Sequence, residues 1–205
     1  MDNYQIARDR AQEYFLQFDQ DRIICRWNLR HNENYLFTEF IGRPYRICRQ
    51  TGQVDRLIDG KQAGFSEVLS IFDQLCYEGK DRFLTGRYAP VNSLRGRPPA
   101  AGVGTDLYTK TADFFGRNEA SFCKACIALG GVPVAMGDLG FRLPLFGEMD
   151  VILKFYRSDD EFPATVTFLY DENTLSFMRY ETVFYVAGFI LEAICEMMNS
   201  EGGGI

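Results

Sequence analysis

One segment, residues 137–181, constrains the fold of this chain more than any other. It contains three apolar runs, at residues 141–146, 150–156 and 164–170, and it ends in the start of a long apolar helix. The breaks between the runs are short and rich in glycine, proline and acidic residues, which is typical of turns. The pattern therefore predicts an antiparallel meander that is followed by a helix.

The rest of the chain adds further helices and short strands. Apolar spacing predicts helices at residues 3–19, 64–78 and 118–129, with Ser66 and Asn118 as N-caps. Strand-like runs occur at residues 23–29, 35–41, 45–48, 54–58 and 132–136. The last helix, over residues 174–198, is apolar on all sides in its middle, which indicates burial. We therefore predict an α+β fold: a mostly antiparallel sheet with packed helices and a buried C-terminal helix.

The chain has 205 residues, which fits one α+β domain over residues 1–200 and a flexible tail at residues 201–205. Residues 80–110 are rich in glycine, proline and arginine and carry no apolar period, so they are predicted to lack regular structure. A subdivision of the domain near residues 80–110 stays open as an alternative.

Composition restricts the partners and the compartment. The net charge of −6 argues against nucleic acids and anionic membranes as partners, because phosphate groups need a basic surface. The longest apolar run, residues 183–191, is too short to span a bilayer. The charged amino terminus lacks the apolar stretch of a secretory signal. We therefore expect a cytoplasmic protein whose six cysteines are reduced.

Three motifs that resemble reactive sites have simpler explanations. Cys123 and Cys126 form a CxxC pair inside a predicted helix, and the sequence offers no second pair to complete a zinc site, so we interpret them as buried thiols. His31 is the single histidine and lies in a polar turn. Residues 102–105 lack the lysine of a phosphate-binding loop. The sequence predicts no metal site and identifies no cofactor.

Acidic residues occupy the turns of the meander. Asp138 precedes the first strand, and Glu161 belongs to the acidic turn at residues 159–161; alternating turns place both at one end of the sheet. Turn geometry alone explains such residues. The alternative is that Asp138 and Glu161 act as an acid–base pair.

Arginines supply the opposite charge in the segment 80–110. Arg87, Arg95 and Arg97 lie among glycines that permit close approach of a ligand. Because a guanidinium binds a carboxylate or phosphate through two parallel hydrogen bonds, we predict a site for a small anion there. A solvated loop is the alternative.

The chain resembles an uncharacterised family of bacteria and archaea, mostly anaerobes, that is classed as a domain of unknown function. The resemblance rests on Gly137-Asp138, the Pro-Leu-Phe of residues 144–146, the Asp-Glu-Phe-Pro of residues 160–163, and residues 168–171, with Glu181 as the helix glutamate. A weaker match covers residues 86–94. The similarity thus concerns the second half of the chain, and some family members carry a four-cysteine iron–sulfur segment similar to that of corrinoid proteins. This chain has no such cluster.

Three functions remain open at this point. The first is an accessory module that binds a small anionic ligand or a protein partner, linked through the resemblance to anaerobic one-carbon or corrinoid metabolism. The second is an enzyme for a small anionic substrate, with the arginine loop at residues 82–97 and with Asp138 or Glu161 as acid–base group. The third is a structural subunit of a homo-oligomer.

Overall fold

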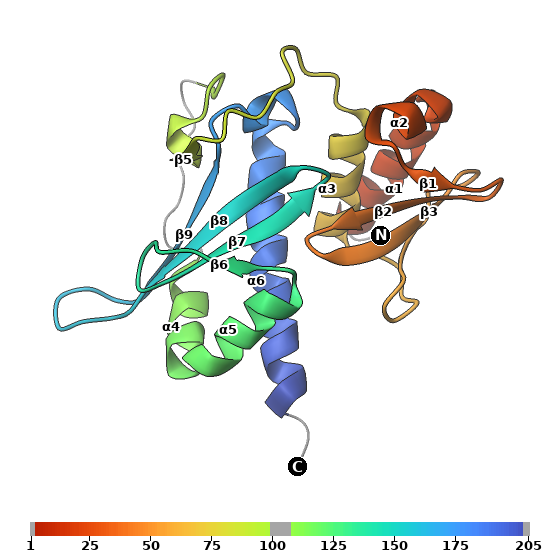
Figure 1. Cartoon of the computed structure of the whole chain (residues 1–205). Coiled ribbons are helices and arrows are strands. Elements are labelled where there is room, and N and C mark those ends of the chain that lie inside the picture. Colours follow the sequence, from red (N-terminus) through yellow and green to blue (C-terminus); the bar gives the residue numbers. More distant parts are fainter. Residues whose placement is uncertain (1–2, 99–107, 203–205) are drawn as a thin grey trace.

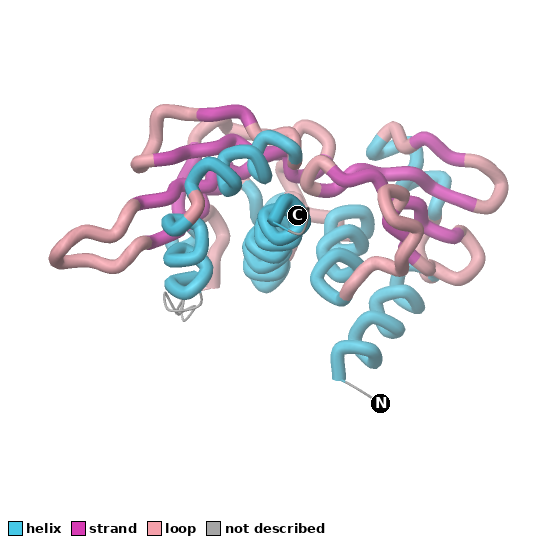
Figure 2. Tube along the Cα trace, turned by 90° about the horizontal axis from the view of Figure 1, so that it is seen from below, coloured by secondary structure: helices cyan, strands magenta, loops and turns pink. Residues whose placement is uncertain are grey.

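The computed structural model describes residues 3–98 and 108–202. Its strands form two antiparallel sheets that lie next to each other along one side of the molecule, with most helices along the other side (Figures 1 and 2). The predicted α+β class and antiparallel pairing are confirmed. The amino-terminal strands do not join the sheet of the meander but form a sheet of their own.

The amino-terminal sheet has the order β1-β2-β3-β4. Its strands are β1 (Arg30–His31), β2 (Tyr35–Phe40), β3 (Arg43–Cys48) and β4 (Val54–Arg56). Alternate residues of β3 are buried, because one face of the sheet packs on the core. Helices α1 (Asn3–Leu16) and α3 (Phe65–Cys76) pack against each other beside this sheet.

The carboxy-terminal sheet has the order β5-β9-β8-β7-β6. Its strands are β5 (Tyr88–Pro90), β6 (Val132–Pro133), β7 (Leu139–Phe146), β8 (Met149–Tyr156) and β9 (Thr165–Asp171). Helices α4 (Thr109–Arg117) and α5 (Glu119–Ala128) lie beside it. Asn118 caps α5 as predicted, because its side chain accepts the backbone N–H of Ser121 at 3.2 Å.

Helix α6 (Tyr180–Gly202) follows the short helix η3 (Thr174–Ser176) and is the shared centre of the core (Figure 1). Its Phe189 stacks on Phe40 of β2 with ring centroids 5.3 Å apart. Its Val183 carbonyl accepts the hydroxyl of Tyr170 from β9 at 3.2 Å. Both sheets thus contribute to one hydrophobic core, and the predicted burial of the last helix is confirmed. Within the described parts of the chain, no helix has both the length and the hydrophobicity that crossing a bilayer requires.

The predicted strand at residues 23–29 is wrong: the chain forms helix α2 (Gln20–Trp27) there. Asp19 caps this helix by accepting the backbone N–H groups of Asp21 and Arg22 at 3.0 and 3.1 Å. Asn28 ends it in the left-handed conformation, with φ of 49°. Short apolar runs are ambiguous between strand and helix, and here the two caps favour the helix.

Two further predictions need correction. Ser66 is not the N-cap of helix α3: the cap lies two residues earlier, at Gly64, and the Glu67 carboxylate accepts the Gly64 N–H at 2.6 Å. The segment 80–110 is not without regular structure, because it contains β5 and the short helix η1 (Val91–Ser93). Strand β5 pairs with β9 from Tyr88 to Pro90.

Candidate functional site

The acidic residues at one end of the meander hold turns together. The Asp138 carboxylate accepts the backbone N–H of Arg157 at 2.7 Å. Asp159 accepts the N–H groups of Glu161 and Phe162 at 2.9 and 2.7 Å, and these bonds lower the pKa of Asp159. The Glu161 side chain itself is exposed. The turn roles of Asp138 and Asp159 are thus visible in the structure.

The predicted arginines lie at the opposite end of β9. Arg87 binds the Glu172 carboxylate through Nε and Nη2 at 3.1 and 2.8 Å, and Arg95 reaches the same oxygen at 3.2 Å. Arg97 is exposed, and its Nη1 contacts the Pro98 carbonyl. One carboxylate therefore receives two guanidinium groups, and the buried carboxylate of the neighbouring Asp171 adds a second negative charge at this end.

The arginines and the pair Asp138/Glu161 are not brought together. Tyr156 of β8 pairs with Thr165 at the start of β9, whereas Glu172 follows the end of that strand. At about 3.3 Å per residue, the two ends lie roughly 20 Å apart. A site that combines Arg87 or Arg95 with Asp138 is therefore not formed by this fold.

Asp171 at the end of β9 holds the segment between α3 and β5 in place through hydrogen bonds. This buried carboxylate accepts the N–H groups of Thr85 and Gly86, both at 2.8 Å, and the Thr85 hydroxyl at 3.0 Å. The backbone of Glu172 bonds to Arg87 and Arg95 on the same side. These contacts fix the path of residues 85–95, the arginine segment, and place residues 90–92 beside β9.

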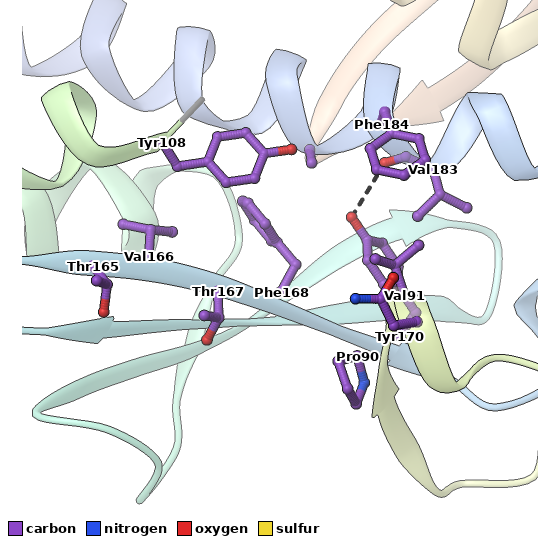
Figure 3. Close-up of a pocket in the computed structure, with 12 residues that line it drawn as sticks. Pro90, Val91, Tyr108, Thr165, Val166, Thr167, Phe168, Tyr170, Val183 and Phe184 are labelled. Atoms are coloured by element: carbon purple, nitrogen blue, oxygen red, sulfur yellow. Dashed lines mark hydrogen bonds between the residues drawn. The ribbon is translucent and has the colours of Figure 1, made fainter. Parts of the chain in front are cut away.

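A cavity of about 270 Å³ lies between β9, the segment after β5 and helix α6 (Figure 3). Its walls are mostly apolar and include Pro90, Val91, Phe168, Val183 and Ala187. In Figure 3, Val166 and Phe168 point from β9 toward α6, while Thr165 and Thr167 lie on the other face of the strand. The cavity therefore belongs to the inner, core-facing side of the sheet.

Two tyrosines contribute phenol groups to the cavity. Tyr108 packs edge-on against Phe168 with centroids 5.9 Å apart, and burial raises the pKa of its phenol. Burial also raises the pKa of Tyr170 well above its ordinary value, and its hydroxyl donates to the Val183 carbonyl. Both phenols are thus neutral at physiological pH, and the Tyr108 hydroxyl can serve a ligand as a hydrogen-bond donor.

The sequence reasoning did not find this cavity. Its residues on β9 and α6 were predicted to be strand and helix core, because an apolar wall and an apolar core have the same pattern, and its other residues fell in the segment 80–110. The CxxC cysteines are not part of this cavity. Cys126 is buried, Cys123 is half-buried, and burial raises the pKa of both thiols. His31 is exposed on β1. Among the described residues, no cluster of side chains suited to holding a metal ion is found.

The fold and cavity define an α+β protein with two antiparallel sheets around one central helix. The chain belongs to the family DUF3786, a domain of unknown function, whose model matches residues 19–193. The match extends through the amino-terminal sheet and so is wider than the resemblance in the second half of the chain. No curated protein and no solved structure matches the chain.

Proposed function

We propose that this protein is an accessory module that binds a small organic acid, with the apolar body of the ligand in the cavity between β9 and α6. The observation that carries the proposal is the cavity itself, with its apolar walls and the phenol of Tyr108. An apolar cavity of ~150 Å³ accommodates benzene. A cavity of about 270 Å³ suits one aromatic ring or a short acyl chain.

The charge near the cavity favours an acid over a neutral ligand. Residues 90–92 form part of the wall, and Arg95 and Arg97 follow within five residues of Asn92. Arg87 and Arg95 share one carboxylate, Glu172, and Arg97 is exposed, so guanidinium donors are available to an additional anion at this end. We infer that the acid group of the ligand binds near Arg95 and Arg97, and that Arg87 holds Glu172 in place.

Binding is tested by thermal unfolding and calorimetry with phenylacetate, benzoate and hexanoate, each compared with its neutral amide. A ligand at ~100 times its dissociation constant adds about 2.7 kcal/mol, which raises the melting temperature of a chain of this size by roughly 5–10 °C. We expect the acids to stabilise the protein more than the amides. Absence of any shift with all these acids would refute the proposal.

The location is tested by a variant that fills the cavity. Ala187 is buried in its wall, so Ala187→Leu should abolish the ligand-induced shift while the protein stays folded. Ala120→Leu, at an exposed position of α5, is the matched control and should bind as the wild type does. Corrinoids, which the family resemblance suggests, belong in the same screen. A corrinoid ring is far larger than this cavity, so its binding would indicate another surface.

A further inference from the structure

A second feature, independent of the cavity, lies where α2 meets the segment after α3. The guanidinium of Arg82 lies over two aromatic rings, 4.7 Å from the ring centroid of Trp27 and 5.1 Å from that of Phe177. The Trp27 ring is in turn braced edge-on by Phe146, with centroids 4.9 Å apart. Two aromatic rings therefore contribute cation–π contacts to the same guanidinium.

The edge of the same guanidinium has no acceptor. The Nε and Nη2 atoms of Arg82 are shielded from solvent and find no hydrogen-bond partner. These two atoms form the fork that binds a carboxylate through parallel hydrogen bonds. A buried donor without a partner is energetically unfavourable and calls for an explanation.

In other arginines of this chain, the same pair of donors, Nε and Nη2, binds a carboxylate. Nε and Nη2 of Arg56 contact Glu67 at 2.8 and 2.7 Å. The same atoms of Arg157 contact Glu119 at 2.6 and 2.7 Å, and those of Arg87 contact Glu172. In each of these pairs the partner is a carboxylate of the chain. Arg82 presents the same donors without such a partner among the described residues.

The surroundings of Arg82 are positively charged. Glu78 accepts a hydrogen bond from Arg26 at 2.7 Å and lies 3.2 Å from Arg22. Arg82 is close enough to contribute to the lowered pKa of Glu78, after Arg26 and Arg22. Burial, followed by the charge of Arg26, lowers the pKa of Arg82 itself. One carboxylate thus faces three guanidinium groups, and an added anion would reduce their repulsion.

A third donor belongs to the same cluster. The indole Nε1 of Trp27 is also buried without a hydrogen-bond partner. Arg82, Trp27 and Phe177 are only partly buried, so the cluster lies near the surface, although the three donor atoms themselves are shielded from solvent. We propose that Arg82 and Trp27 form a binding site for an oxyanion, a carboxylate or a phosphate, which the fork of Arg82 holds through two hydrogen bonds.

Trp27 is the single tryptophan of the chain, so its fluorescence reports on this site directly. The wild type is titrated with sodium acetate and, separately, with sodium phosphate, at an ionic strength kept constant with sodium chloride. We expect a saturable change in fluorescence with at least one of the two anions; the stronger one identifies the carboxylate or the phosphate class. A change that is absent, or that rises linearly without saturation, would overturn the proposal.

Two variants separate recognition from folding. Arg82→Lys keeps the positive charge near the rings but loses the fork, and Arg82→Gln loses both; each should weaken anion binding at least tenfold. Arg30→Gln, which removes an exposed arginine that lies over Phe37 instead, is the matched control and should bind normally. Circular dichroism confirms folding. Unchanged anion binding by a folded Arg82→Lys protein would contradict the assignment, whereas loss of acid binding by the cavity variant Ala187→Leu would leave it intact.

Discussion

The carboxylate of Asp73, on α3, caps the helix that begins after Arg179. Its Oδ2 accepts the backbone N–H of Arg179 at 2.7 Å and the hydroxyl of Thr182 at 2.7 Å, while Oδ1 binds the Arg179 guanidinium. The Asp73 side chain is only 5% exposed. An acceptor with negative charge at the first turn of α6 satisfies free N–H groups and interacts favourably with the helix dipole.

Replacement of Asp73 should therefore destabilise the whole protein. We expect Asp73→Ala to lower the free energy of unfolding by about 2–4 kcal/mol, because it removes the cap and leaves buried donors without an acceptor. Urea denaturation measures this change. Asp21→Ala is the control: Asp21 pairs with Arg49 at the surface, with its side chain 84% exposed, and should cost under about 1 kcal/mol. Equal effects of the two substitutions would contradict the capping role.

Tyr45 should make stability fall at high pH. Its hydroxyl donates to Glu67 at 2.6 Å, and burial, followed by the negative charge of Glu67, raises the pKa of Tyr45 far above its ordinary value of 10.0. Below pH 10 the phenol is protonated in both folded and unfolded chains, so its contribution is fully present. Above pH 10 the unfolded chain releases this proton first, so stability falls by up to about 1.4 kcal/mol per pH unit.

The comparison with Tyr45→Phe isolates this effect, because the other titrating groups are common to both proteins. Unfolding free energies at pH 8, 9, 10 and 11 should show a steeper decline for the wild type than for Tyr45→Phe. At pH 7 the variant should be less stable by about 1 kcal/mol, the value of one hydrogen bond. Parallel profiles above pH 10 would show that Tyr45 does not titrate as we infer.

Asp171 should control the order of the arginine segment. Asp171→Ala removes the acceptor of the Thr85 and Gly86 N–H groups, and we expect faster amide exchange at residues 85–90 together with a loss of about 2 kcal/mol. Hydrogen exchange read by mass spectrometry resolves this segment. Asp150→Ala, on the neighbouring β8, is a suitable control, because Asp150 receives the Tyr88 hydroxyl but no N–H from residues 85–86. Unchanged exchange in Asp171→Ala would rule out the fastening role.

The cysteines should differ sharply in reactivity. Cys25 is exposed, whereas Cys76 and Cys126 are buried. Burial raises the pKa of Cys76 to about 12 and also raises that of Cys126, so few thiolates form at either site near neutral pH. A thiol reagent at pH 8 should label Cys25 in the folded protein and label the other two only in urea. Rapid native labelling of Cys126 would contradict the interpretation of the CxxC pair as buried thiols.

The sequence predicted the elements whose signals are local. Asn118 was recognised as a cap because its type and position are distinctive, and the meander was recognised from its turns. The run Ile23–Trp27 was misread because its apolar residues suit either element, and the deciding contacts came from Asp19 and Asn28 at its ends. Strand β5 was missed because it has only three residues, one of them Pro90, and so carries almost no pattern. Its pairing with β9 depends on a tertiary contact.

The candidate site was harder to predict for a physical reason. Arginine and carboxylate residues are conspicuous in a sequence, but here Arg87 and Arg95 bind Glu172, and Asp138 holds a turn. The cavity depends on the space left between β9 and α6, which Phe168 and Ala187 line, and no residue type encodes such a space. Arg82 became distinctive only when its neighbours Trp27 and Phe177 were in place.

The position of α6 in the chain has a consequence for biosynthesis. The helix follows every strand of both sheets, yet Phe40 in the first half and Tyr170 in the second both pack or bond to it. A ribosome releases the amino-terminal sheet well before α6 exists, so the apolar face of that sheet stays uncovered while the remaining residues are made. The nascent protein should accordingly depend on chaperones until residues 180–202 emerge, and folding should then be completed by one late step.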